Sequence, residues 1–168
     1  MDQSTTDSWL ASNRARSLLA LVMAAEAGAC DEVPVGALLA EPQGRIIAAA
    51  GNRCVIASDP IGHAEIGALR LGAARINNYR LIDAQLTVTL EPCPLCLEAA
   101  AMARLAPIQY AALRELPSKP IQPSRMLQQN LEHAHAAGAV LQFFFAQKRE
   151  VLSSERKSVL LCKSKGEE

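Results

Sequence analysis

The amino-acid sequence predicts an α/β protein with three layers, in which helices cover both faces of a central sheet. Segments with apolar residues at helical spacing alternate with short apolar segments that are typical of buried strands. Their expected order is helix, strand, strand, helix, strand, helix, strand. Of the 168 residues, 50% are hydrophobic, which suffices for one compact domain over residues 1–168 with a core from about 9 to 160.

The first third of the chain is expected to form a helix followed by a β-hairpin. Residues 9–29 have apolar side chains at helical spacing. Residues 35–40 and 46–50 have the composition of two paired strands, and residues 42–44 form the turn between them. Residues 52–62 contain Ser, Asp, Pro and Gly and are therefore predicted to be a loop.

The rest of the chain is expected to complete the sheet. A helix is predicted over residues 63–74, a strand over 85–90, a helix from a cysteine motif to about residue 104, and a strand over 108–113.

The C-terminal third has weaker patterns. Three prolines between residues 117 and 123 predict a loop, followed by a helix over 125–137, a short edge strand over 139–141 and a last helix over 142–160. Residues 162–168 form a polar tail, which is expected to be disordered.

Two short motifs carry the chemistry, H-x-E at residues 63–65 and P-C-x-x-C at residues 92–96. Zinc takes imidazole and thiolate ligands in tetrahedral geometry, and a catalytic site leaves one position open for water. Cys93 and Cys96 have a spacing that places both sulfurs on one side of a helix. The flanking prolines favour a helix N-terminus at this point, where the helix dipole stabilises thiolates. The sequence therefore predicts that His63, Cys93 and Cys96 bind a catalytic zinc ion.

Glu65 stands two residues from His63, a spacing that does not share a helix face. We expect it to carry protons for the water that zinc activates, and not to be a fourth ligand. The alternatives are a structural metal site or two unrelated cysteines. A structural site would need a fourth protein ligand, and no suitable residue stands near either motif.

The remaining features indicate a cytoplasmic protein. The chain has 17 basic and 17 acidic residues, so its net charge gives no global indication of nucleic-acid binding. Cys30, Cys54 and Cys162 lie far apart and show no disulfide framework. The first residues are acidic and polar, unlike a signal peptide, and no apolar run is long enough for a membrane helix.

Two further motifs have less specific interpretations. His133 and His135 are expected to be a pair of surface histidines, with a second metal site as the alternative. Phe143-Phe144-Phe145 is expected to be a core-facing helix segment, with a base-stacking platform as the alternative.

The H-x-E and P-C-x-x-C signature is that of zinc nucleobase deaminases, and residues 15–100 resemble the bacterial tRNA-specific adenosine deaminases. The stretches that carry this resemblance are Glu32-Val33-Pro34-Val35-Gly36-Ala37, Asn52-Arg53, Asp59-Pro60, His63-Ala64-Glu65-Ile66, Asn78-Tyr79-Arg80-Leu81-Ile82-Asp83-Ala84 and Val88-Thr89-Leu90-Glu91-Pro92-Cys93.

The resemblance implies a cytidine-deaminase-like fold with a five-stranded mixed sheet, a homodimer, and one zinc ion per subunit. It also implies conversion of the wobble adenosine of a tRNA anticodon to inosine, with Glu65 as the proton shuttle. Asn52 would hydrogen-bond the target base, and Val33 and Pro34 would wall the pocket.

The sequence departs from that family after Cys96. Leu97-Glu98-Ala99 replaces a usual Gly-Ala pair, and residues 114–120 replace a usual segment with Asp, Lys and Gly-Ala-Gly-Ser. These departures leave the metal motif intact and concern the surface that would contact RNA. A deaminase of free nucleobases or nucleosides, such as guanine or cytosine, is therefore an alternative. A non-catalytic subunit of the same fold is a third hypothesis, against which the intact Glu65 speaks.

Overall fold

The computed structural model describes residues 12–114, 126–129 and 133–163, and their side chains as far as Val151. A five-stranded sheet in the order β2-β1-β3-β4-β5 forms its centre. The strands are β1 (Gly36–Ala40), β2 (Ile46–Gly51), β3 (Gln85–Leu90), β4 (Ile108–Ala112) and β5 (Leu127–Gln129). β1 pairs antiparallel with β2 and β3, whereas β3–β4 and β4–β5 are parallel pairs, so the sheet is mixed, as the resemblance implied.

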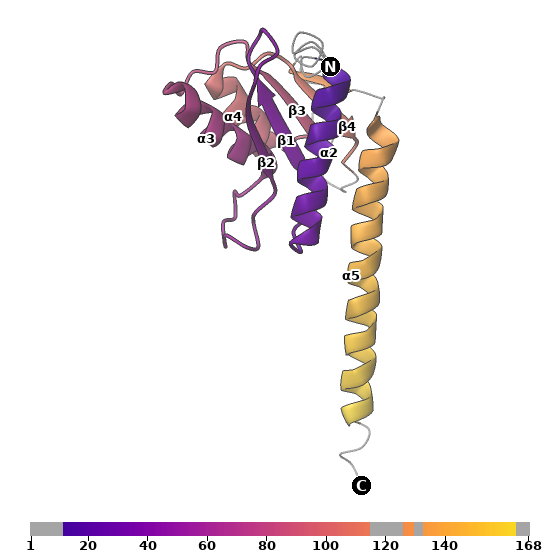
Figure 1. The fold of residues 1–168 in the computed structure, drawn as a ribbon. Helices are drawn as coiled ribbons and strands as arrows, with labels where there is room; N and C mark the ends of the chain where they lie inside the picture. The colour runs from indigo at the N-terminus through magenta and orange to yellow at the C-terminus, as the bar shows by residue number, and fades with distance from the viewer. Residues whose placement is uncertain (1–11, 115–125, 130–132, 164–168) are drawn as a thin grey trace.

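Helices cover both faces of this sheet, which confirms the predicted fold class. α2 (Asn13–Ala29) and α5 (Ala134–Lys163) lie side by side on one face, and α3 (Ala64–Ile76) and α4 (Pro94–Ala103) lie on the other (Figure 1). The C-terminal half of α5 extends well beyond the sheet (Figure 1). None of the described helices combines the length and the apolar character that crossing a membrane requires.

α2 packs unusually close to β1 because both contribute small residues. Ser12 begins the helix, and its side chain accepts a hydrogen bond from the backbone N–H of Ala15 at 3.2 Å. Ala20 and Ala24 are fully buried against the sheet. A Cβ atom on Gly36 would lie 2.0 Å from the carbonyl oxygen of Ala20, so only glycine fits beneath this helix.

The hydrophobic core lies on both faces of the interior strands β1 and β3. Leu39, Leu86 and Val88 are completely or almost completely buried, as is Ile108 on the neighbouring strand. All five residues of β1 are buried, which is typical of an interior strand covered by helices on both faces.

The C-terminal third differs from the sequence-based expectation. The helix predicted over 125–137 is wrong over residues 127–129, because Leu127–Gln129 is strand β5 and pairs with β4, whereas residues 134–137 are helical as the start of α5. The strand predicted over 139–141 is also wrong, because it lies within α5. Ala137 is buried and Leu141, one helical turn later, packs with it against β4, so tertiary packing determines the structure here.

Two further expectations lie partly or wholly outside the described residues: the proline-rich loop and the polar tail. Where the tail was predicted to begin, at residue 162, α5 continues to Lys163.

Candidate functional site

The predicted site residues gather at one end of the sheet, and the strand register explains why. Gly36 at the start of β1 faces Gly51 at the end of β2, and Ala37 faces Val88 near the end of β3. Because these pairs are antiparallel, the end of β2, the end of β3 and the start of β1 lie at the same end of the sheet. The segment before β1 and the segments after β2 and β3 therefore all leave the sheet there. This end of the sheet therefore carries Val33, Pro34, Asn52 and the cysteine motif.

Each of the three predicted metal ligands lies at the beginning of a helix. His63 is the N-cap residue of α3 and Cys93 is the N-cap residue of α4, while Cys96 lies in the first turn of α4. Pro94 occupies the start of α4, as expected for a residue that lacks a backbone N–H. The two helix N-termini thus point their partial positive charge at the same place.

The three donor atoms converge. His63 Nδ1 lies 3.4 Å from Cys96 Sγ and 3.5 Å from Cys93 Sγ, and the two sulfurs are 3.5 Å apart. Tetrahedral zinc with ordinary bond lengths would place nitrogen and sulfur about 3.6 Å apart and two sulfurs about 3.8 Å apart. The observed triangle is therefore within a few tenths of an ångström of the geometry that zinc requires. In the described part of the chain, these three residues form the group that can hold a metal ion.

The two thiol groups shift each other's pKa in opposite directions. The hydrogen bond between the two thiol groups lowers the pKa of Cys93 to about 5, and His63 also lowers it. The same hydrogen bond, together with burial, raises the pKa of Cys96. At neutral pH Cys93 is consequently a thiolate, the form that binds metals.

Glu65 lies in the first turn of α3 and is only 4% exposed. Burial is the largest influence on its carboxyl group and raises the pKa above its ordinary value, and Cys93 adds to this rise. The Glu65 backbone N–H, His63 and Cys96 oppose it. The Glu65 carboxyl group thus interacts with all three predicted metal ligands, but it is not one of the three ligating groups.

The predicted substrate contacts lie in segments that leave the sheet at the same end as the metal motif. Asn52 is 8% exposed, and its backbone N–H donates to the carbonyl oxygen of Val35 at 2.9 Å. Pro34 is buried and Val33 is half-buried against the main core. The role of all three residues in binding a substrate stays a prediction.

Sequence reasoning assigned no role to Glu32, which the structure makes prominent. Its side chain is 1% exposed, and its two carboxylate oxygens accept hydrogen bonds from Asn52, Val55 and Ile56. The sequence offered one indication of this role: Glu32 is an acidic residue directly before the apolar segment that leads into the buried strand β1.

The other two motifs do not join the site. His135 is exposed and His133 half-buried, and neither belongs to a group of three metal donors within the described residues. Phe143 is 66% and Phe145 44% exposed, so the expectation of a core-facing segment is wrong for these two residues.

Comparison with known proteins agrees with this geometry. Residues 12–112 match the family model for the cytidine and deoxycytidylate deaminase zinc-binding region. The tRNA-specific adenosine deaminase of Haemophilus influenzae is 45% identical over 93 residues, which cover 55% of this chain and 54% of that protein. The chain therefore spans about half the length of this relative.

Two solved structures are similar over most of the chain. One comes from a study of A-to-I editing by tRNA:A34 deaminases at the wobble position; it is 33% identical with a TM-score of 0.67, over 77% of this chain and 100% of that one. The other is a guanine deaminase from Bacillus subtilis, 26% identical with a TM-score of 0.58, over 78% of this chain and 94% of that one.

Proposed function

We propose, since the chain belongs to the cytidine and deoxycytidylate deaminase zinc-binding family, that it is a hydrolase that converts the wobble adenosine of a tRNA anticodon to inosine. The observation that carries this proposal is the convergence of His63, Cys93 and Cys96 beside the buried carboxyl group of Glu65. The substrate is supported by the 45% identity to a tRNA-specific adenosine deaminase.

In this proposal His63, Cys93 and Cys96 hold one zinc ion. Zinc, when bound, makes water a stronger nucleophile at neutral pH. The Glu65 carboxylate accepts a proton from the attacking water and delivers protons to the base and to the departing amine. Overall, a bond forms between C6 of adenine and the water oxygen, the bond from C6 to the exocyclic nitrogen breaks, and ammonia leaves.

The neighbouring residues would hold the base. Asn52 carries both a donor and an acceptor and can hydrogen-bond a base edge, while Val33 and Pro34 offer an apolar wall. A base reaches such a site only when it is turned out of its stack, which an anticodon loop allows at low cost.

A deaminase of free guanine or a related base is the second candidate. The similarity to the Bacillus subtilis guanine deaminase favours it, as does the departure from the tRNA-specific family after residue 113. Zinc-loaded protein should be incubated with an anticodon stem-loop and, separately, with guanine and cytosine. Inosine in the stem-loop supports the first proposal, whereas ammonia release from a free base alone supports the second. A non-catalytic role gains support if no substrate reacts.

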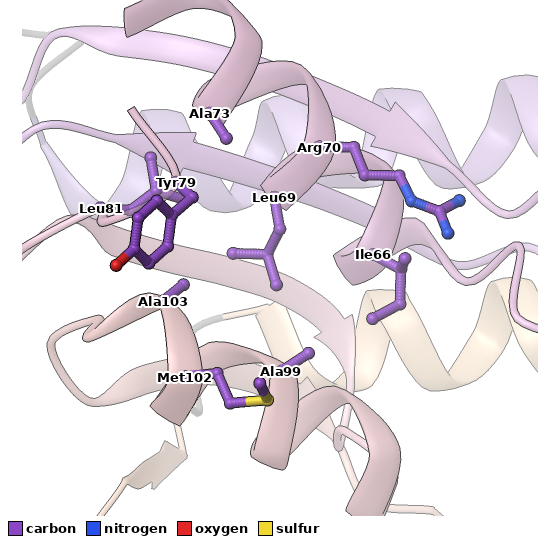
Figure 2. Close-up of a pocket in the computed structure, with 9 residues that line it drawn as sticks. All are labelled: Ile66, Leu69, Arg70, Ala73, Tyr79, Leu81, Ala99, Met102 and Ala103. Carbon is purple, nitrogen blue, oxygen red and sulfur yellow. The ribbon is translucent and has the colours of Figure 1, made fainter. Parts of the chain in front are cut away.

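We also propose that the protein is a homodimer that uses the apolar groove between α3 and α4. Figure 2 shows Leu69 at the centre of this groove, with Tyr79 on one side of it and Ile66 on the other, and with the Arg70 side chain directed away from Tyr79. Met102 is 78% and Tyr79 68% exposed, so a large apolar area faces solvent. A second copy of the chain is the occupant that the family resemblance implies.

Met102→Glu should shift the sedimentation coefficient to that of a monomer, and an unchanged coefficient would contradict this interface.

A cytoplasmic location is proposed on two grounds. A tRNA substrate is found there, and the four cysteines whose side chains are described are free thiols, as expected in a reducing compartment.

A further inference from the structure

Glu32 is a fully buried carboxylate with three hydrogen-bond partners. Its Oε2 accepts from Asn52 Nδ2 at 3.1 Å, and its Oε1 accepts from the backbone N–H groups of Val55 and Ile56, both at 2.8 Å. Burying a carboxylate is costly unless hydrogen bonds replace the lost water. The described residues place no Lys, Arg or His in an ion pair with Glu32, so these three N–H groups provide that replacement.

The chemistry of the partners fixes the orientation of the Asn52 side chain. All three partners of Glu32 are N–H groups, so both carboxylate oxygens act as acceptors. Asn52 must therefore turn its NH₂ group toward Glu32 and its Oδ1 away from it. The Cys54 thiol, 3.7 Å from Asn52 Oδ1, is consistent with this orientation because a thiol can donate to an oxygen.

The same carboxylate anchors the chain that leads to the metal ligands. Residues 53–58 form a helical turn, in which Ala57 N–H donates to Arg53 O at 3.1 Å. The Val55 and Ile56 N–H groups at its start are satisfied by Glu32. Arg53 N–H in turn donates to Gly62 O at 2.8 Å, directly before His63. One side chain thus supports both Asn52 and the segment that positions His63.

We propose that Glu32 is a positioning residue that sets the donor and acceptor polarity with which Asn52 meets the substrate base. The proposal rests on the proposed function, which assigns Asn52 to the base. An asparagine side chain is nearly symmetric in shape, so its neighbours decide which end is oxygen and which is nitrogen. A site that hydrogen-bonds its substrate discriminates strongly against a base with the opposite pattern. Glu32 would therefore contribute to base selectivity without touching the base.

Glu32→Gln tests this polarity with little change in shape. The new glutamine can keep its oxygen on Val55 and Ile56, but its NH₂ group then faces the NH₂ group of Asn52. Asn52 relieves this conflict by turning over, which presents nitrogen where the base met oxygen. We expect kcat/KM to fall about ten- to a hundredfold, the effect of one mispaired buried polar group, with zinc content unchanged. Glu41→Gln, which removes a carboxylate at the hairpin turn, is the matched control and should change neither quantity.

A double-mutant cycle separates positioning from a merely structural role. Asn52→Asp alone places two acceptors face to face and should lower kcat/KM. Combining it with Glu32→Gln restores a donor–acceptor pair and returns an oxygen to the place of Asn52 Oδ1. The double variant should therefore be at least about tenfold more active than Asn52→Asp. A double variant no better than Asn52→Asp would overturn the proposal.

A measurement without turnover keeps this test independent of the proposed function. In NMR spectra of the zinc-loaded full chain, the Asn52 side-chain amide is the signal missing from Asn52→Asp. Its protons should exchange with solvent at least about tenfold more slowly in the wild type than in Glu32→Gln, because the hydrogen bond to Glu32 is lost. Equal exchange rates would refute the positioning role. Failure of the proposed function would instead be seen in the wild type, as absence of deamination.

Discussion

Glu65 and the three predicted metal ligands have separate functions. The Glu65 carboxyl group interacts with the ligands but is not one of the groups that would bind the metal. This separation means that the carboxyl group can be altered while the metal site is kept. The ligands, in contrast, are coupled to folding, since they join the starts of α3 and α4. Substitutions at the two kinds of residue should therefore have different consequences.

Glu65→Gln should retain zinc and lose deamination. The amide keeps the size of the side chain but cannot accept and return a proton, so we expect kcat to fall by about 10²- to 10⁴-fold. Zinc content is measured by elemental analysis and turnover by inosine formation in the stem-loop. Glu98→Gln, on the exposed side of α4, is the control. Wild-type turnover in the Glu65 variant would refute the proton-carrier role.

Cys96→Ser should remove the metal. Cys96 is completely buried and its sulfur lies 3.5 Å from Cys93 Sγ, so a hydroxyl group at this position cannot replace the thiolate. Zinc affinity should drop by more than the roughly 10- to 100-fold that follows loss of an outer partner of a metal ligand. Competition with a chelator measures this affinity. Cys30→Ser, at an exposed cysteine, should leave it unchanged.

Among the elements, those from β1 to α4 and the strand β4 were predictable from sequence, including the ones that carry the site. α3, β3 and α4 begin within one or two residues of the predicted positions; Gly62 lies just before α3, and prolines flank Cys93 at the start of α4. The cysteine spacing also predicted the convergence of Cys93 and Cys96, since helix geometry alone places the two sulfurs together. Glu32 was missed because its partners at residues 52, 55 and 56 become neighbours only when the hairpin folds.

The short β5 was missed for a related reason. Leu127–Gln129 has no strand pattern of its own, and it becomes a strand by pairing with β4, where Leu127 faces Ile108. Over 139–141 the local composition favoured a strand, whereas packing of Ala137 and Leu141 on β4 favours the helix. Both errors arise where contacts distant in sequence outweigh local preference.

The close packing of α2 on β1 yields a prediction at the element scale. Gly36→Ala should lower the free energy of unfolding by about 2 kcal/mol or more, because the new methyl group would meet the backbone of α2. Gly138→Ala is the matched control, since nothing lies within 4 Å of a Cβ at that position of α5. It should raise the free energy of unfolding by up to about 1 kcal/mol. Urea unfolding measures both, and equal effects would contradict the close contact.

At the scale of the whole molecule, charge is balanced, with 17 basic and 17 acidic residues. Attraction of RNA must therefore come from where the charges lie and not from their sum. A hollow of about 440 Å³ beside His63 is lined by Arg53 and Arg70, which place positive charge next to the candidate site. Arg70 forms an ion pair with Asp59 at 3.4 Å, whereas the described residues include no ion pair of Arg53.

This arrangement predicts that Arg53 contributes to the salt dependence of the affinity for RNA. Each phosphate of a single-stranded loop that the protein neutralises contributes a slope of about −0.7 to the plot of log affinity against log salt concentration. Arg53→Gln should make that slope shallower by about 0.7 for an anticodon stem-loop, as measured by fluorescence anisotropy at several salt concentrations. Arg45→Gln removes the same charge from the hairpin turn, at the opposite end of β1 and β2 from Asn52, where Arg45 pairs with Glu41. It should leave the slope unchanged. If both variants change the slope equally, binding follows the net charge of the protein, and the arginine beside His63 has no specific part in holding RNA.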